Sequence, residues 1–143
     1  MGKFARILVP VDGSAGSDRA VDTAVAISEA CGAALDILYV SYFNSDTDGD
    51  MDTWLPDFVA APAGDEIHTV LEQARRRVPE GIEVKFHQRT GKPAKQIVEF
   101  SKENGDETIV ICGRGLDVVR GFLLGSVSQE VMEAASGAVI VVK

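Results

Sequence analysis

The sequence predicts an α/β fold, an open parallel sheet of five strands in the order 3-2-1-4-5 with helices on both faces. Short apolar, β-branched runs alternate with segments of helical period along the whole chain. Several of these runs are apolar on both sides, as strands covered on both faces should be. Each run is separated from the next by a connection long enough for a crossover, which makes the strands parallel. The length of 143 residues suits one domain over residues 1–143.

The first strand is predicted over Ala5–Val11, a short β-branched run that ends at the turn signal Asp12-Gly13-Ser14. A helix is predicted over Ser14–Cys31, and Gly32 supplies its stop signal. Apolar residues recur in this helix at spacings of four, three and four, which predicts a buried stripe. The stripe consists of Ala20, Ala24, Ile27 and Cys31.

A second strand is predicted over Ala34–Ser41, followed by a loop over about residues 42–62. Residues 44–66 hold seven acids and no lysine or arginine, so most of the net charge of −8 lies there. The spacing of Asp46, Asp48 and Asp50 loosely resembles a calcium loop, but Met51 replaces the required glycine, and a solvated acidic loop is the interpretation. We expect the loop aromatics to pack on the protein's own surface or on a dimer mate. They are Tyr42, Phe43, Trp54 and Phe58.

The alternation continues through the second half of the chain. Pro93 opens a helix at a favoured first-turn position, and three arginines at residues 75–77 suit the negative end of the preceding helix. The predicted elements are a helix over Asp65–Val78, a strand over Ile82–Arg89, a helix from Pro93 with Ile97, Val98 and Ser101 inward, a strand over Thr108–Cys112, a helix over Gly125–Ser136 and a strand over Ala138–Val142.

Composition excludes several classes of protein and site. The acidic balance argues against binding a nucleic-acid backbone. The sequence has no apolar run near the 18 residues of a membrane span and begins without a signal-peptide pattern, so a cytoplasmic location is expected. Cys31 and Cys112 are read as two free thiols in a reducing compartment. His68 and His87 lack metal-ligand spacing and are interpreted as surface or structural residues.

Candidate ligand-binding residues follow strands 1 and 4, where the strand order of such a sheet reverses and ligands bind. Strand 1 ends in Pro10-Val11-Asp12-Gly13-Ser14, and strand 4 ends in Cys112-Gly113-Arg114-Gly115. Gly125-Ser126-Val127-Ser128 begins the next helix. Glycines allow close approach of the backbone, and free amides at a helix start favour a phosphate.

Polar side chains supply the remaining chemistry at these positions. Ser126 and Ser128 can donate hydroxyl hydrogen bonds to phosphate oxygens, although Ser128 is equally compatible with a plain first-turn role. Arg114 and Arg120 add positive charge. Asp12 can bind ribose hydroxyls or a Mg²⁺ ion. No catalytic residue is predicted.

The spacing of Gly115, nine further residues and then Gly125-Ser126 resembles part of the G-x2-G-x9-G-[ST] pattern of nucleotide-binding universal stress proteins. The resemblance covers nearly the whole chain. The other matching segments are Ile7–Ser14, Thr90–Pro93, Leu123–Ser128 and Ala138–Val142.

This resemblance implies a Rossmann-like fold, akin to the adenine nucleotide alpha hydrolases, and a homodimer paired through Ala138–Val142. It also implies an ATP site, with Val40 at the adenine. The other implied binding residues are Pro10, Val11, Asp12, Gly115, Gly125, Ser126, Val127 and Ser128.

The sequence departs from the family pattern at Cys112, which stands where the first motif glycine is expected, with Gly113 one position late. A Cys112 side chain aimed at the ligand would crowd it, whereas one aimed into the sheet would cost nothing. The leading hypothesis is a stress-response module that binds ATP or a related adenine nucleotide, together with Mg²⁺ if the nucleotide carries it, and that changes its interactions with a protein partner according to occupancy. The alternatives are a nucleotide-free dimeric scaffold and a slow ATPase.

Overall fold

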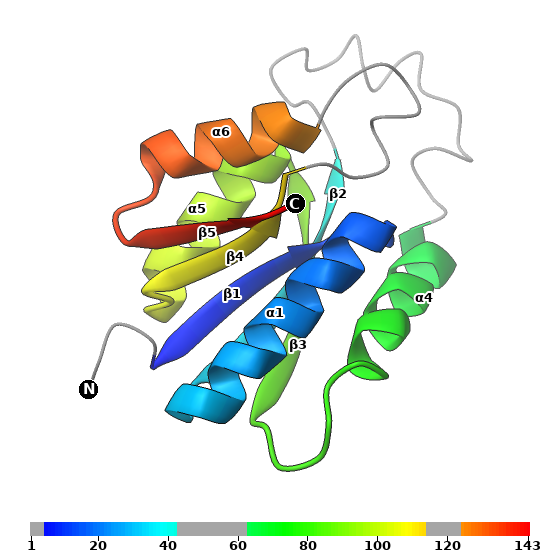
Figure 1. Cartoon of the computed structure of the whole chain (residues 1–143). Helices are drawn as coiled ribbons and strands as arrows, with labels where there is room; N and C mark the ends of the chain where they lie inside the picture. The colour runs from blue at the N-terminus through cyan, green and yellow to red at the C-terminus, as the bar shows by residue number, and fades with distance from the viewer. Residues whose placement is uncertain (1–4, 43–62, 114–123) are drawn as a thin grey trace, which may run out of the picture.

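The computed structural model describes residues 5–42, 63–113 and 124–143 and confirms the predicted sheet. Its five strands are parallel and lie in the order β3-β2-β1-β4-β5 (Figure 1). None of the helices in these ranges is long and apolar enough to cross a lipid bilayer. The elements are β1 (Arg6–Val11), α1 (Ala15–Cys31), β2 (Ala34–Tyr42), α4 (Ala63–Arg75), β3 (Val84–Gly91), α5 (Pro93–Asn104), β4 (Thr108–Cys112), α6 (Leu124–Ala134) and β5 (Ala138–Val142).

Helices cover both faces of the sheet, α1 and α4 on one and α5 and α6 on the other (Figure 1). Successive side chains of a strand point to opposite faces, so β1 contributes to both cores. Ile7 and Val9 are fully buried on the α1 face, and Leu8 is fully buried on the α5 face. The central strand is therefore apolar throughout because it has no face in contact with water.

The helix boundaries follow from local signals in the sequence. Ser14 caps α1, and its side chain accepts a hydrogen bond from the amide of Ser17. Gly32 and Gly105 end α1 and α5 in the left-handed conformation, with φ of 75° and 72°. Pro93 occupies the first turn of α5, as predicted.

Two predicted boundaries in the middle of the chain are wrong by two or three residues. The helix expected to reach Val78 ends at Arg75, because the amides of Arg77 and Val78 bond to carbonyls three residues back and Pro79 follows. Only Arg75 of the three arginines thus lies in the helix. The strand expected over Ile82–Arg89 runs instead over Val84–Gly91, in register with β2 up to Tyr42.

Two further corrections concern helix ends. The last helix covers Leu124–Ala134 and stops two residues before the predicted Ser136. Cys31 was expected on the buried stripe of α1 but is exposed, as are its neighbours Glu29 and Ala30. The last turn of α1 therefore lies outside the core that its preceding turns help to form.

Gly137 supports the turn into β5 at a place where a side chain has no room. A Cβ atom on Gly137 would overlap the backbone carbonyl of Glu107. We expect Gly137→Ala to lower the free energy of unfolding by about 3 kcal/mol or more, because backbone has to move. Gly32→Ala is the matched control: its Cβ meets open space, so the left-handed φ alone should cost about 1 kcal/mol. Urea unfolding of both variants tests the difference, and equal losses would contradict it.

The two cysteines should differ sharply in reactivity. Cys31 is exposed, whereas Cys112 is 1% exposed and packs in the core beneath α1. Ellman's reagent should therefore modify Cys31 in a fast phase, and Cys112 in a slow phase limited by opening of the fold. Cys31→Ser should abolish the fast phase. Reaction of both thiols at one rate in the native protein would contradict this placement of Cys112.

Candidate functional site

The ladder between β1 and β4 ends halfway along the strands. Pairing joins Ile7 to Thr108 and Leu8 to Ile109, and no further pair of these strands forms in the described residues. On its other side, β1 pairs with β2 as far as Val11 and Tyr39. The carboxyl end of β1 is thus paired with β2 but, in the described residues, not with β4. This place is where the strand order of the sheet was predicted to reverse.

Two residues of β1 explain why the ladder stops. The amide of Ala34 on β2 bonds to the carbonyl of Ala5, so odd-numbered residues of β1 face β2 and even-numbered ones face β4. Pro10 therefore faces β4, but it has no N–H group that could donate a hydrogen bond to that strand. The next amide on that side belongs to Asp12, and it donates to the hydroxyl of Ser17 at 3.3 Å instead.

A compact turn links the end of β1 to α1 and orients Asp12. The amide of Ser14 donates to Oδ1 of Asp12 at 2.9 Å, an Asx-type turn. Ser17 donates its own hydroxyl to the carbonyl of Ser14 at 3.1 Å. Gly13 has a φ of 85°, which L residues rarely adopt, and a Cβ there would lie 3.2 Å from Val70 of α4. The turn is therefore suited to glycine for two independent reasons.

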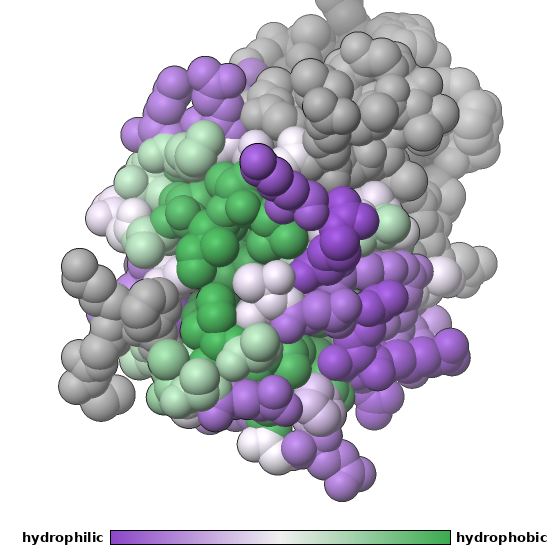
Figure 2. All heavy atoms as spheres, viewed as in Figure 1, coloured by the Kyte–Doolittle hydropathy of each residue, from purple (hydrophilic) through white to green (hydrophobic). Residues whose placement is uncertain are grey.

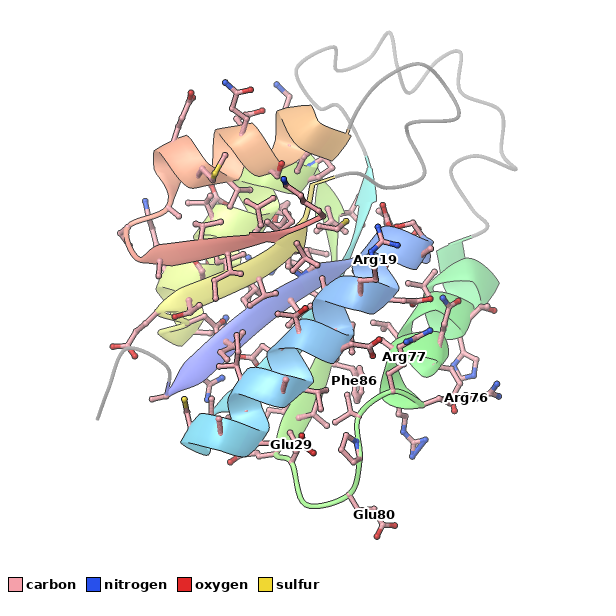
Figure 3. The ribbon with its side chains drawn as sticks, viewed as in Figure 1. Arg19, Glu29, Arg76, Arg77, Glu80 and Phe86 are labelled. Atoms are coloured by element: carbon pink, nitrogen blue, oxygen red, sulfur yellow. The ribbon has the colours of Figure 1, made fainter. Side chains whose placement is uncertain are left out.

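α4 is bonded to this turn and to α1 by side chains. Nε2 of Gln73 lies 2.9 Å from Oδ1 of Asp18 and 3.4 Å from the carbonyl oxygen of Gly13. Arg77 reaches across to α1 and pairs with Asp22 at 2.8 Å and Asp18 at 3.4 Å (Figure 3). These contacts hold the start of α1, and hence the turn at Asp12, against a second helix.

The end of β4 shows in which direction the side chain of Cys112 points. Its side chain packs with Val110 in the core beneath α1, so it points into the sheet and takes no space at the strand end. The amide of Gly113 donates to the carbonyl of Val142 at 2.9 Å, which holds the strand end against β5. A Cβ on Gly113 would lie 3.3 Å from Val141, so a small residue suits this position.

The structure brings the predicted residues of β1, β2 and β4 to one edge of the sheet. Val11, Val40 and Val127 direct their side chains toward the two cores. Ser128 is 3% exposed on α6. Gly125 and Ser126 lie in the first turn of α6, whereas Arg114, Gly115 and Arg120 lie outside the described residues. The residues at the carboxyl edge, as described, are Pro10, Val11, Asp12, Val40, Cys112 and Gly113.

Sequence reasoning missed Ser17 and the role of its partner Ser14. Their spacing of three residues at a helix start is a capping pattern and was the available signal. Because Ser14 already satisfies the amide of Ser17, the start of α1 has one fewer donor for an anion. The first turn of α6 contains no acidic residue to repel one.

The edge also contains cationic and anionic side chains. Arg19 of α1 donates from Nε to the carbonyl oxygen of Lys143 at 2.9 Å, which places a guanidinium beside the end of the chain (Figure 3). In the described ranges, no three or more histidine, cysteine or acidic side chains gather in an arrangement that could hold a metal. A cation at Asp12 would therefore need ligands from a bound molecule or from water.

Comparison with known proteins agrees with this architecture. The model of the universal stress protein family matches residues 3–143. The chain is 29% identical to the universal stress protein YxiE of Bacillus subtilis (strain 168), with 98% of this chain and 99% of that protein aligned. UspA of Lactobacillus plantarum superposes with a TM-score of 0.77 at 25% identity, over 100% of both chains.

A second solved structure, described as a universal stress protein in complex with cAMP, has a TM-score of 0.74 and 30% identity. The alignment covers 99% of each chain. The family match covers nearly all residues, and the chain superposes on solved members of that family over almost its whole length. The chain belongs to the universal stress protein family.

Proposed function

We propose that this protein binds an adenine nucleotide at the carboxyl edge of the sheet, between β1 and β4, and that occupancy alters its contacts with a protein partner. The observation that carries the proposal is the end of the β1–β4 ladder at Pro10 and Asp12. The structural relative that is 30% identical was solved with cAMP, which supports an adenine nucleotide as the ligand class. ATP is the ligand that the glycine pattern favours.

Each end of the nucleotide has candidate partners. Asp12 would accept hydrogen bonds from the ribose hydroxyls through the oxygen that the turn leaves over, since Oδ1 is used by Ser14. The backbone at Val40 would meet the adenine. The phosphates would lie near the residues that end β4 and begin α6, because the amides of a helix start favour an anion. These are Gly113, Arg114, Gly115, Gly125 and Ser126, with Val127 and Ser128 next along the helix.

The arrangement also fits Mg²⁺ if the nucleotide supplies part of its coordination. Asp12 offers a carboxylate oxygen, the ligand type that Mg²⁺ prefers. The sequence argument for a nucleotide-free scaffold rested on Cys112, and the burial of that side chain removes its basis. We further propose that residues 1–143 act as one domain in the cytoplasm, in keeping with two free cysteines.

Substitutions of Asp12 separate its charge from its role in the turn. Asp12→Asn keeps an oxygen for the amide of Ser14 but loses the negative charge, whereas Asp12→Ala loses both. We expect either variant to weaken Mg-ATP binding by about 10- to 100-fold, the loss of a charged hydrogen bond worth about 1.5–3 kcal/mol. Calorimetric titration of nucleotide-stripped protein measures the affinity, with cAMP as a second ligand.

Asp22→Asn is the matched control, because Asp22 lies further along α1 and pairs with Arg77. It should bind like the parent. Gly125→Val should block phosphate approach at the start of α6 while leaving cAMP less affected than ATP. Absence of binding by the parent would overturn the proposed function, and unchanged affinity in both Asp12 variants would overturn the site.

We propose that a homodimer forms through the free edge of β5. Even-numbered residues of β5 bond to β4, as the amide of Ala138 does to Glu107, so the amides of Val139 and Val141 face outward. Val141 is 38% exposed, and Met132 on α6 is 49% exposed. Figure 2 shows a hydrophobic area over β5 and its surroundings, bordered by hydrophilic residues. An uncovered apolar edge strand is a template for pairing with a second copy.

Val141→Pro tests this interface without breaking the β4–β5 ladder, because it removes an amide that faces outward. We expect the dimer to dissociate in light-scattering measurements, while Val141→Ala, which retains the amide, keeps most of the dimer. Ile140→Asp, the variant suggested by the sequence, is unsuitable because Ile140 packs against the core beneath α1. A monomeric parent, or a dimer unaffected by Val141→Pro, would contradict the interface.

A further inference from the structure

A buried polar cluster lies at the opposite, amino-terminal edge of the sheet. It consists of Arg6 at the start of β1, Asp36 on β2, His87 on β3 and Asp106 in the segment before β4. Arg6 contacts Asp36 at 2.5 Å, and Nε2 of His87 lies 2.9 Å from the other oxygen of Asp36. The side chains of Asp36 and Asp106 are 2% and 0% exposed. Two carboxyl groups are therefore held out of water around one guanidinium.

Within the described part of the chain, the hydrogen bonds of this cluster leave both oxygens of Asp106 without a partner. Both oxygens of Asp36 have donors, from Arg6 and His87. Neither oxygen of Asp106 accepts a hydrogen bond from the described residues, and Nε of Arg6, which also has no hydrogen-bond partner there, stays 3.6 Å from Oδ1 of Asp106. An ionised carboxylate buried without a donor is costly. A protonated Asp106 removes that cost, since its hydroxyl can donate to Asp36.

The electrostatics of the cluster agree with this assignment of the proton. Burial, followed by the hydrogen bond and the negative charge of Asp36, raises the pKa of Asp106 to about 8, against the lowering effect of Arg6. Burial alone would raise the pKa of Asp36, but hydrogen bonds from Asp106, His87 and Arg6 outweigh it and lower that pKa. Asp36 is thus the carboxylate of the pair and Asp106 the acid.

Asp106 lies in a segment with a cavity on one side. Residues 105–107 join α5 to β4 and border a cavity of about 660 Å³ that also contacts Ser136 and Gly137 before β5. Three backbone bonds hold the segment: the amides of Gly105 and Asp106 both donate to the carbonyl of Ser101, and the amide of Ala138 donates to the carbonyl of Glu107. The nearby charged groups are Lys102 and Glu107 along the cavity and Glu83 beside Arg6, in addition to the cluster itself.

We propose that the proton shared by Asp106 and Asp36 is a pH-sensitive latch that keeps residues 105–107 closed against β1 and β2. With the proton present, Asp106 bridges this segment to Asp36 on β2. When the proton is lost, two buried carboxylates compete for Arg6, and the segment moves toward the cavity, which allows Asp106 to reach water. The protein would thereby sense a rise in pH at the edge remote from the proposed nucleotide site.

The direction and range of the response follow from proton linkage. The closed state retains the proton up to a pKa of about 8, whereas the open state releases it near the ordinary value of 3.8. Closure is therefore most favourable below pH 4 and weakens as pH rises towards 8. The equilibrium constant for opening should rise by up to about tenfold per pH unit within that window and level off above it. The lowered pKa of Asp36 affects the opening equilibrium only at the acidic end of the pH range.

Amide hydrogen exchange followed by NMR tests the latch in the full chain without ligand. The reporters are the amides of Asp106 and Ala138, with protection factors corrected for the intrinsic pH dependence of exchange. Between pH 5.5 and 7.5, we expect their protection to fall by about 100-fold, as two pH units of linkage require. Asp106→Asn, which keeps a donor for Asp36 without a titrating proton, should abolish this fall.

Glu107→Gln is the matched control, because it removes an exposed charge next to the cluster and should keep the pH dependence. His87→Gln is included as well, because His87 contacts Asp36 directly. Unchanged pH dependence in Asp106→Asn would overturn the proposal. Loss of the pH dependence in Glu107→Gln alone would assign the effect to surface charge, and its loss in His87→Gln alone would assign it to His87. Either result would also overturn the proposal.

A direct titration keeps the proposal testable if Asp106→Asn fails to fold. The carboxyl carbon of Asp106 in the parent protein should titrate near pH 8 by ¹³C NMR. A midpoint below pH 5 would show that Asp106 is ionised in the closed state, and the latch would be excluded.

Discussion

The hydrogen-bonding capacity of β1 is the constraint on which the rest of the structure depends. As the central strand it is covered on both faces and paired on both sides, so each of its backbone groups has to find a partner. Pro10 has no amide hydrogen to offer β4, and the amide of Asp12 is used by Ser17. The sheet therefore stops pairing at its centre, at the edge where helices begin and where their free amides accumulate.

The polar side chains at the two ends of β1 differ in how their hydrogen-bonding groups are satisfied. At the carboxyl end, Asp12 is half-buried and its turn satisfies one carboxylate oxygen, which leaves binding capacity for a ligand. At the amino end, Arg6 and Asp36 are joined by a short ion pair, and Asp106 is added without enough donors to ionise. A buried ion pair contributes little net stability, but removing one member is costly. Because an unpaired buried charge is costly, gain or loss of a single proton in the proposed latch would have a large effect at the amino edge.

The structure also shows which candidate residues at the carboxyl edge have side chains that are already used for packing. Val11, Val40 and Val127 use their side chains to fill the cores, so a ligand at the carboxyl edge would meet their main chain. Gly13 serves the geometry of the turn and the packing of α4 at the same time.

The sequence by itself determined the class of fold and the strand ends at which the candidate residues lie, because these follow from apolar periodicity and from turn residues close in sequence. The strand order expected for this fold class agrees with the structure. Strands β4 and β5 were predicted to the residue. The ends of α4 and β3 were missed, because they depend on local turn bonds before Pro79 and on register with β2. Only the tertiary structure decided which way Cys112 points and that Arg6, Asp36, His87 and Asp106 meet. These outcomes depend on the pairing of strands distant in sequence, which no local pattern encodes.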